Sequence, residues 1–382
     1  MLLEFSVTNF RSIKEKQTLS LLKTNKNELP NNFTTVTLST GKTLDVLNSA
    51  VIYGANASGK SNLVSAMWRM REIIQDNINI INKTLPVESF LLSEETINEP
   101  TEFEIDFVDA SGVRFVYGFM TTQEKIIDEW LYQYPKGRPQ TLIDRKDTNT
   151  WGEMTALKGS KKLWQKNTKN NSLFLSTATK LNAKQLSDIF NTLDLIWLRG
   201  TNWENLPFAA NTLHGASIEM VDFIKKADMG INNIYIKDNR VKTEHITLDK
   251  QPFEFDLLTQ ESTGTVKFFS ISADWLDVMK KGACLFVDEL QNSLHPKLVE
   301  HLVQMFHNPE INKNGAQLIF VTHETSLLDQ EVFRRDQVWF CEKENNATEL
   351  FSLADFSVRK GYENIEKFYL SGRYGAVPYL RN

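Results

Sequence analysis

A glycine-rich segment, GANASGKS at residues 54–61, matches the pattern Gly-x4-Gly-Lys-Ser at every fixed position. A short apolar run precedes it at residues 50–53, and a helical pattern of apolar residues follows at 63, 67, 70 and 74. The backbone amides of such a loop, with the positive end of the following helix, form a concave site for phosphate groups. We therefore predict a site for a nucleoside triphosphate, ATP, together with Mg2+.

The residue types in this segment predict separate roles. Lys60 is expected to reach the outer phosphates and to act in catalysis, and the hydroxyl of Ser61 is expected to bind Mg2+. The other nucleotide contacts that we predict here are Gly54, Asn56, Ala57, Ser58, Gly59 and Asn62.

Two apolar runs in the C-terminal half end in further residues that could do chemistry. ACLFVDE at 283–289 ends in Asp288 and Glu289, and the run at 317–321 is followed by Thr-His, ending at His323. Such runs suit buried parallel strands whose carboxyl ends open into the nucleotide site. Asp288 is expected to hold Mg2+ and Glu289 to orient or deprotonate the attacking water. His323 alone would be read as a core or capping histidine, but beside the carboxylate strand a role in stabilising charge on the γ-phosphate is favoured.

Taken together, these segments resemble the ABC-type ATPases, in the branch that includes SMC, RecF and OLD proteins. GANASGKS resembles their Walker A motif, LFVDELQNSLHP at 285–296 their Walker B motif and D-loop, and FVTHETSLLD at 320–329 their switch histidine. The opening LLEFSVTNFRS at 2–12 resembles the start of that branch. The ending YLSGRYGAVP at 369–378 is similar to that of stand-alone ATPases in abortive-infection and restriction-associated loci, among them RloA, the AbiL ATPase and AriA of PARIS.

The resemblance implies active sites that are completed between two subunits. Residues 261–265 stand in the place of the ABC signature, so Ser262 and Gly264 are expected to contact ATP held by another subunit. Arg11 either contacts the nucleotide, as the resemblance implies, or anchors the N-terminal sheet. The signature reads ESTG instead of the usual LSGG, and no glutamine stands clearly in the place of the Q-loop.

The elements that must position these residues are predicted from the patterning of the chain. Strands are expected at 2–7, 18–22, 36–38, 102–108 and 113–119, and helices at 181–190 and 218–227. The pattern predicts an α/β fold in three parts, and the resemblance implies that its core is an ABC-type P-loop core. These are an N-terminal half with a mixed and antiparallel sheet and Walker A (1–134), an inserted, largely helical subdomain (135–250), and a C-terminal half with a parallel sheet and the remaining motifs (251–382).

Composition favours a globular, cytoplasmic protein. Of the 382 residues 41% are hydrophobic and 24% charged, proportions that exclude a disordered chain. Both cysteines, Cys284 and Cys341, lie in apolar runs, so we expect buried free thiols. No apolar stretch is long enough to span a membrane, and the chain starts with a strand pattern instead of a signal peptide, so no membrane partner is expected.

Nucleic acid could be a partner, although the net charge of −5 does not indicate binding by the whole surface. A lysine cluster surrounds Trp164, formed by Lys158, Lys161, Lys162, Lys166 and Lys169. It could hold a nucleic-acid backbone while Trp164 stacks on a base. The simpler interpretation, which the sequence favours, is a solvated face beside a packed aromatic residue.

The function that the resemblance implies is ATP hydrolysis in bacterial antiphage defence by abortive infection. A homo-oligomer of at least two subunits would control a separately encoded effector, for example a TOPRIM-type nuclease. The chain lacks the heptads of an SMC coiled coil, and after Glu342 it lacks the paired carboxylates of a metal-dependent nuclease. A RecF-like DNA-repair clamp and an ATP-bound scaffold with negligible turnover are the alternatives.

Overall fold

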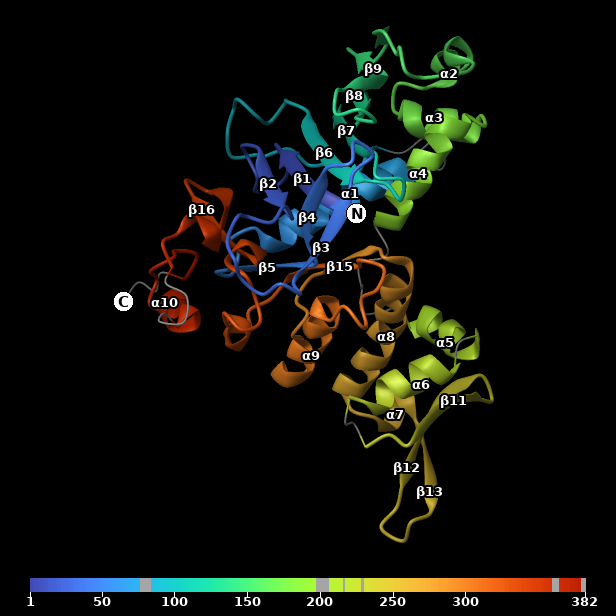
Figure 1. The fold of residues 1–382 in the computed structure, drawn as a ribbon, viewed down its shortest axis with the longest axis vertical. Coiled ribbons are helices and arrows are strands. Elements are labelled where there is room, and N and C mark those ends of the chain that lie inside the picture. The colour runs from blue at the N-terminus through green and yellow to red at the C-terminus, as the bar shows by residue number, and fades with distance from the viewer. Residues whose placement is uncertain (76–83, 197–205, 216, 228–229, 359–363, 379–382) are drawn as a thin grey trace.

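The computed structural model describes residues 1–75, 84–196, 206–215, 217–227, 230–358 and 364–378. An antiparallel sheet with α2–α4 lies at one end of the molecule, β11–β13 with α5–α7 lie at the other, and a mainly parallel sheet lies between them (Figure 1). The predicted α/β fold class is confirmed. No described helix is long and apolar enough to cross a membrane.

The antiparallel sheet has seven strands in the order β10-β9-β8-β7-β6-β1-β2. Their bounds are β1 Leu2–Thr8, β2 Gln17–Ser20, β6 Thr101–Val108, β7 Arg114–Thr121, β8 Ile126–Gln133, β9 Gln140–Lys146 and β10 Thr150–Trp151. A separate hairpin is formed by β3 (Phe33–Thr37) and β4 (Thr43–Leu47). The strands predicted at 2–7, 102–108 and 113–119 therefore correspond to β1, β6 and β7.

The mainly parallel sheet carries the candidate site, and its order is β14-β15-β5-β16-β17. Its strands are β5 Ser49–Gly54, β14 Cys284–Val287, β15 Gln317–Val321, β16 Val338–Glu344 and β17 Ala347–Ser352, of which only β17 is antiparallel to its neighbour. A third sheet consists of β11 Asn233–Lys237, β12 Arg240–Ile246 and β13 Pro252–Asp256.

The helices pack around these sheets. Their bounds are α1 Lys60–Gln75, α2 Lys161–Asn167, α3 Phe174–Lys180, α4 Lys184–Ile196, α5 Leu206–Gly215, α6 Ser217–Lys225, α7 Leu257–Gln260, α8 Thr263–Lys281, α9 Pro296–His307 and α10 Ile365–Leu370. The helix predicted at 181–190 corresponds to α4 and the one predicted at 218–227 to α6. Pro296 is the first residue of α9, and His295 caps it by accepting a hydrogen bond from the amide of Lys297.

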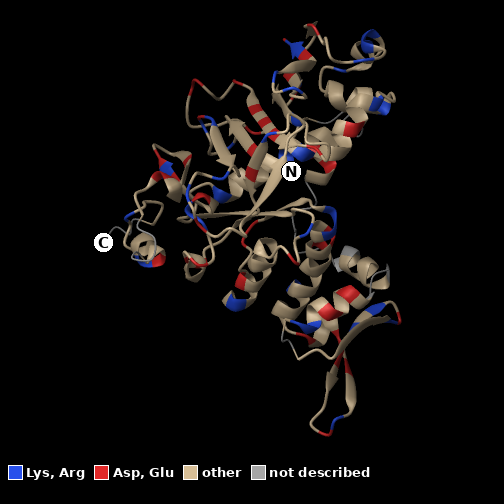
Figure 2. Cartoon of the chain, viewed as in Figure 1, with Lys and Arg blue, Asp and Glu red and all other residues tan. Residues whose placement is uncertain are grey.

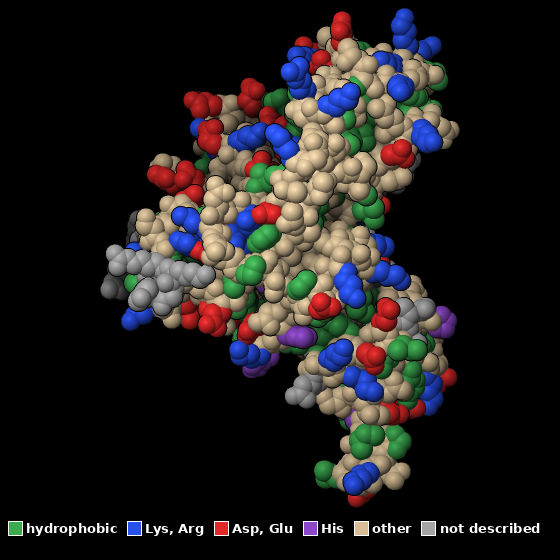
Figure 3. Space-filling model, in the orientation of Figure 1, with side chains coloured by type: hydrophobic (Ala, Val, Ile, Leu, Met, Phe, Trp, Pro, Cys, Tyr) green, Lys and Arg blue, Asp and Glu red, His purple; other side chains and the backbone are tan. Residues whose placement is uncertain are grey.

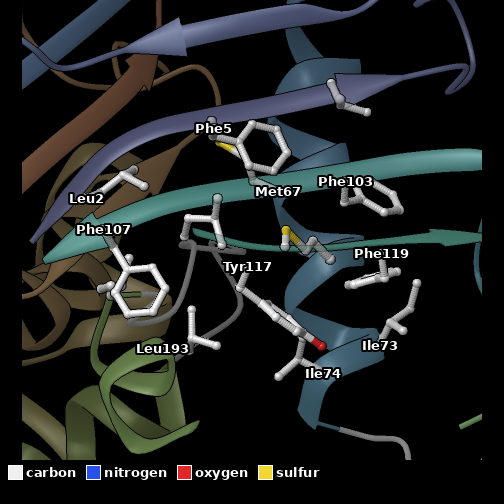
Figure 4. Packing of buried hydrophobic residues seen from close by; sticks show 14 of the residues in the cluster. Leu2, Phe5, Met67, Ile73, Ile74, Phe103, Phe107, Tyr117, Phe119 and Leu193 are labelled. Atoms are coloured by element: carbon white, nitrogen blue, oxygen red, sulfur yellow. The ribbon is translucent and has the colours of Figure 1, made fainter. Parts of the chain in front are cut away.

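Two hydrophobic cores share the parallel sheet, because successive side chains of a strand point to opposite faces. Ala50 and Ile52 of β5 belong to the core that contains α1, whereas Val51 and Tyr53 belong to the core that contains α8 and α9. In the first core, aromatic residues of β1, β6 and β7 pack on the apolar face of α1 (Figure 4). Both cysteines are buried and free, as predicted.

The chain segment between the two halves of the core contains both strands and helices. The turn at 134–139 joins β8 to β9, so the antiparallel sheet continues beyond residue 135, and the first helix after it starts at Lys161. Strands β11 and β12 lie before residue 250. The three-part division of the chain stays a prediction.

Candidate nucleotide-binding site

The glycine-rich loop joins the end of β5 to the start of α1, as predicted. Gly59 has φ +107°, and a Cβ atom there would lie 1.9 Å from Oγ1 of Thr348 and 2.8 Å from Oγ of Ser12. Only glycine fits this position. The amide of Ser58 donates to the carbonyl oxygen of Ala55 at 3.2 Å, which closes the loop into a turn. The amino-terminal end of α1 therefore faces the concave side of the loop.

Lys60 lies inside the curve of the loop, where its side chain is only 5% exposed. Its ammonium group donates to the carbonyl oxygens of Gly54 at 2.8 Å and Ala55 at 2.7 Å. Burial lowers the pKa of Lys60, while Cys341, Asp288 and Glu289 act in the opposite direction. A partly desolvated cation gains much from an anionic partner, so this position suits phosphate binding.

Asp288 follows the last residue of β14 and accepts a hydrogen bond from the hydroxyl of Ser61. Burial raises the pKa of Asp288, and the bond from Ser61 lowers it. Oδ1 of Asp288 is buried without a hydrogen-bond partner among the described residues. Because a hydroxyl and a carboxylate oxygen are ligands that Mg2+ prefers, Ser61 and Asp288 fit a Mg2+ ion.

Glu289 lies in the turn after Asp288 with a left-handed backbone (φ +52°), and its carboxylate accepts a hydrogen bond from the side-chain amide of Asn292. A non-glycine residue held at positive φ is strained, and such strain is concentrated at functional sites. Glu289 lines the cavity beside the loop.

His323 lies two residues after β15, and its side chain is exposed at the same cavity. The surrounding protein lowers the pKa of His323, and the positive charge of Lys60 lowers it further. The ring is therefore neutral at pH 7. A neutral imidazole can still donate one hydrogen bond to a phosphate oxygen.

These groups converge on one cavity of about 520 Å3 at the carboxyl edge of the parallel sheet. It is lined by Asn56, Ala57, Ser58, Gly59, Lys60, Ser61, Asn62, Glu289, Val321, His323 and Lys343. Gly54 lines an adjoining cavity of similar volume, which shares Asn56, Ala57, Ser58, His323 and Lys343 with the first. The arrangement can hold a phosphate chain between a cation, a Mg2+ ligand pair, a carboxylate and an imidazole.

Three predicted nucleotide contacts, Arg11, Ser262 and Gly264, lie outside both of these cavities. Arg11 donates to Oγ of Ser65 on α1 at 3.1 Å and pairs with Glu88 at 3.3 Å, so it ties the N-terminal segment to α1. Ser262 and Gly264 line a separate cavity of about 600 Å3 at the amino-terminal end of α8. Within one chain, the fold does not bring the signature residues to Lys60.

Sequence reasoning missed the residues that brace the loop from behind. Asn62 donates to Oγ of Ser12 at 2.7 Å, Ser12 bonds to Oγ1 of Thr348 at 2.7 Å, and Thr348 donates to the carbonyl oxygen of Ser58 at 2.8 Å. Ser12 and Thr348 are far from the loop and from each other in the sequence, which gives no signal of this chain of bonds. Lys343 was also missed. It lies near the end of β16, which pairs with β5 in parallel, and the carboxyl ends of such strands meet at one edge of the sheet.

Residues 49–329 match the family described as "AAA domain, putative AbiEii toxin, Type IV TA system". A solved structure entitled "Structure of the recombination mediator protein RecF-ATPrS in RecFOR pathway" is similar, with 13% identity over 92% of this chain and 98% of that chain, at a TM-score of 0.37. No curated protein matches.

Proposed function

This chain belongs to the family described as AAA domain, putative AbiEii toxin, Type IV TA system, and we propose that it binds and hydrolyses ATP at the cavity beside the glycine-rich loop. The observation that carries the proposal is the meeting of Lys60, Glu289 and His323 at one cavity, next to the pair Ser61 and Asp288.

In the proposed reaction each residue acts on a separate part of ATP. The loop amides and Lys60 bind the outer phosphates, and Glu289 orients or deprotonates the attacking water. His323 donates a hydrogen bond to the γ-phosphate as negative charge develops there. Mg2+ held by Ser61 and Asp288 would neutralise charge on the phosphates.

We also propose that two subunits share each site and that the ATPase acts in abortive infection. The family description names an AbiEii toxin of a type IV toxin–antitoxin system, which supports this role. The assembly would control a separately encoded effector, for example a TOPRIM-type nuclease. If so, a variant that cannot hydrolyse ATP should lose phage protection when it replaces the parent in its own locus.

Two substitutions test the ATPase proposal. Glu289→Gln keeps an oxygen that can accept from Asn292 but removes the base, so phosphate release should fall about 100-fold or more while ATP binding persists. Lys60→Ala should abolish ATP binding, because the loss of a charged partner from a desolvated pair costs about 2–5 kcal/mol. Binding is measured with a fluorescent ATP analogue, and a thermal melt checks folding.

ATP binding and turnover by the parent protein, measured with and without duplex DNA, distinguish this proposal from its alternatives. Tight ATP binding with no measurable turnover would support a scaffold, and turnover seen only with duplex DNA would support a RecF-like clamp. Phosphate release by Glu289→Gln at the parental rate would remove Glu289 from the reaction.

A further inference from the structure

Positive charge is concentrated in one part of this acidic chain. Residues 135–186 contain eleven Lys and Arg against three Asp and Glu, a net charge of +8, whereas the whole chain carries −5, so the other residues carry −13. This segment forms β9, β10, α2, α3 and the start of α4. Lys and Arg positions are marked along α2 and α3 in Figure 2, and basic side chains gather at the same end of the molecule in Figure 3.

Six exposed lysines on and beside α2, α3 and the start of α4 form what we call the basic patch: Lys158, Lys162, Lys166, Lys169, Lys180 and Lys184. The backbone amide of Lys158 donates to the side chain of Gln185, the neighbour of Lys184, at 3.2 Å, so the first and the last of these lysines in the sequence lie close together. Among the described residues, none of these six side chains forms an ion pair. Their positive charges are therefore not neutralised by ion pairs within the described part of the fold.

The basic patch does not stabilise its own helix. Lys162 and Lys166 are four positions apart on α2, where like charges repel each other and destabilise a helix. A concentration of unpaired positive charge that costs helix stability favours a role in binding an anionic partner.

The backbone under the basic patch is held rigidly. Arg145 is buried and donates to the carbonyl oxygens of Thr148 at 2.6 Å, Ser172 at 2.6 Å and Lys169 at 3.2 Å. Glu129 is also buried and accepts from the first amides of α3, those of Phe174 at 2.6 Å and Leu175 at 2.9 Å. These bonds hold the backbone at Lys169 and at the start of α3, so in this part of the patch binding orders mainly side chains.

The basic patch has no aromatic side chain among residues 141–186 that is placed to stack on a base. Trp164 is only 5% exposed and packs edge-on against Phe174 at 6.5 Å, so it is a packed aromatic and cannot stack on a base. No aromatic side chain is exposed between residues 141 and 186, all of which are described. Ammonium groups without a stacking aromatic residue contact the phosphates of a nucleic acid and not its bases. Such binding favours a duplex, because a duplex has a higher charge density than a single strand.

We propose that the basic patch binds the phosphate backbone of duplex nucleic acid without reading its sequence. The site is separate from the ATP cavity and needs no nucleotide. The −13 charge on the rest of the chain repels a polyanion and so directs it to this end of the molecule.

The test measures binding of a fluorescein-labelled 30-base-pair DNA duplex by anisotropy from 50 to 200 mM KCl, without ATP. The variant is Lys162→Gln with Lys166→Gln, and the control is Lys42→Gln with Lys280→Gln, two lysines that are exposed outside the patch. Each lost phosphate contact should reduce the slope of log K against log [KCl] by about 0.9, so the patch variant should lose about 1.8. Its Kd at 100 mM KCl should rise about 10-fold or more, and the control should match the parent.

Further binding measurements compare RNA and DNA duplexes, a single strand and lipid vesicles as ligands. RNA and DNA duplexes of unrelated sequence should bind within about 10-fold of each other, and a single strand should bind more weakly. The proposal is overturned if the parent does not bind the duplexes at 50 mM KCl, if the patch variant keeps the parental slope, or if the single strand binds more tightly. Patch-dependent binding to phosphatidylglycerol vesicles without duplex binding would also overturn it, in favour of a membrane surface.

Discussion

Individual residues at the site lie in environments that oppose their charge. Burial lowers the pKa of Lys60 and raises the pKa of Asp288, so both are less stable as ions here than in water. Such positions contribute little to folding, and they suit groups that must bind phosphate or a cation. The sequence predicted both residues because the chemistry requires their types at that spacing.

Other residues could not be assigned from the sequence because their partners are distant. The turn at 334–336 is an example: Arg334 and Asp336 form an ion pair that is buried, with Arg334 1% exposed and Asp336 4% exposed. Arg334 also donates to the carbonyl oxygens of Lys26 and Glu28, about three hundred residues away. Only the fold brings these groups together.

A buried histidine leads to a prediction about stability. His307, at the end of α9, lies within 2.8 Å of the hydroxyl of Ser49 at the start of β5, and burial lowers its pKa to about 3. The unfolded chain binds a proton at this residue below its ordinary pKa of 6.5, and the folded chain does not. This contribution to stability is present above pH 6.5 and is lost as the pH falls from 6.5 toward 3.

From pH 7 to 5.5 the loss from His307 alone should be about 1 kcal/mol in the free energy of unfolding. Urea denaturation at the two pH values measures it. The variant His307→Gln removes the titrating group. Between pH 7 and 5.5 its free energy of unfolding should therefore fall by about 1 kcal/mol less than that of the parent. An equal change in parent and variant would contradict the assignment.

At the scale of elements, strands β5, β14 and β15 of the parallel sheet were predictable, whereas β8 and β9 of the antiparallel sheet were not. Apolar runs that end in chemistry-bearing residues identified β5, β14 and β15, because buried parallel strands are apolar on both faces. Strands β8 and β9 are partly exposed and alternate less clearly. The turn between them, rich in proline and glycine, resembled the start of a new subdomain.

The β16–β17 hairpin supports the phosphate loop, which gives a prediction. Thr348→Val keeps the volume of the side chain but leaves the carbonyl oxygen of Ser58 and the hydroxyl of Ser12 without this partner. A lost hydrogen bond of this kind costs about 1 kcal/mol, so ATP should bind about 5-fold more weakly if the bond orders the loop for phosphate.

Binding of a fluorescent ATP analogue measures the change in ATP affinity of Thr348→Val, and a thermal melt measures the change in its stability. The control Thr37→Val changes an exposed residue of β3, for which no side-chain hydrogen bond is found among the described residues. If Thr348→Val lowers the melting temperature but binds ATP as the parent does, the hairpin supports the fold and not the site.

At the scale of the whole molecule, the start of α8 lies at a cavity separate from the ATP cavity of the same chain. Ser262 caps α8 by accepting from the amide of Thr265 at 3.1 Å, and the cavity there is also lined by His295, Lys297 and His301. A helix amino terminus with basic neighbours attracts phosphate. Because Ser262 and Gly264 lie outside the ATP cavity of their own chain, a phosphate contact from them requires a second copy.

The best position to test sharing between subunits is Thr263, the exposed first residue of α8. A side chain at Gly264 would lie 2.7 Å from the carbonyl oxygen of Ser293, so a substitution there would disturb the fold. Thr263→Glu instead places a carboxylate in the first turn of the helix, which stabilises a helix by about 0.3–1 kcal/mol. The same carboxylate repels a phosphate that approaches from another subunit.

The two effects have opposite signs, so they separate folding from function. Thr263→Glu should melt at or above the parental temperature yet hydrolyse ATP at least about 10-fold more slowly, whereas the neutral control Thr263→Gln should retain most activity. Mixed with Lys60→Ala protein, Thr263→Glu should regain hydrolysis, because a mixed dimer contains one site built from two unchanged halves. With random pairing of equal amounts, about a quarter of the parental sites are restored. Sharing is refuted if Thr263→Glu alone hydrolyses ATP like the parent, or if no mixing ratio restores activity although differently tagged copies purify together.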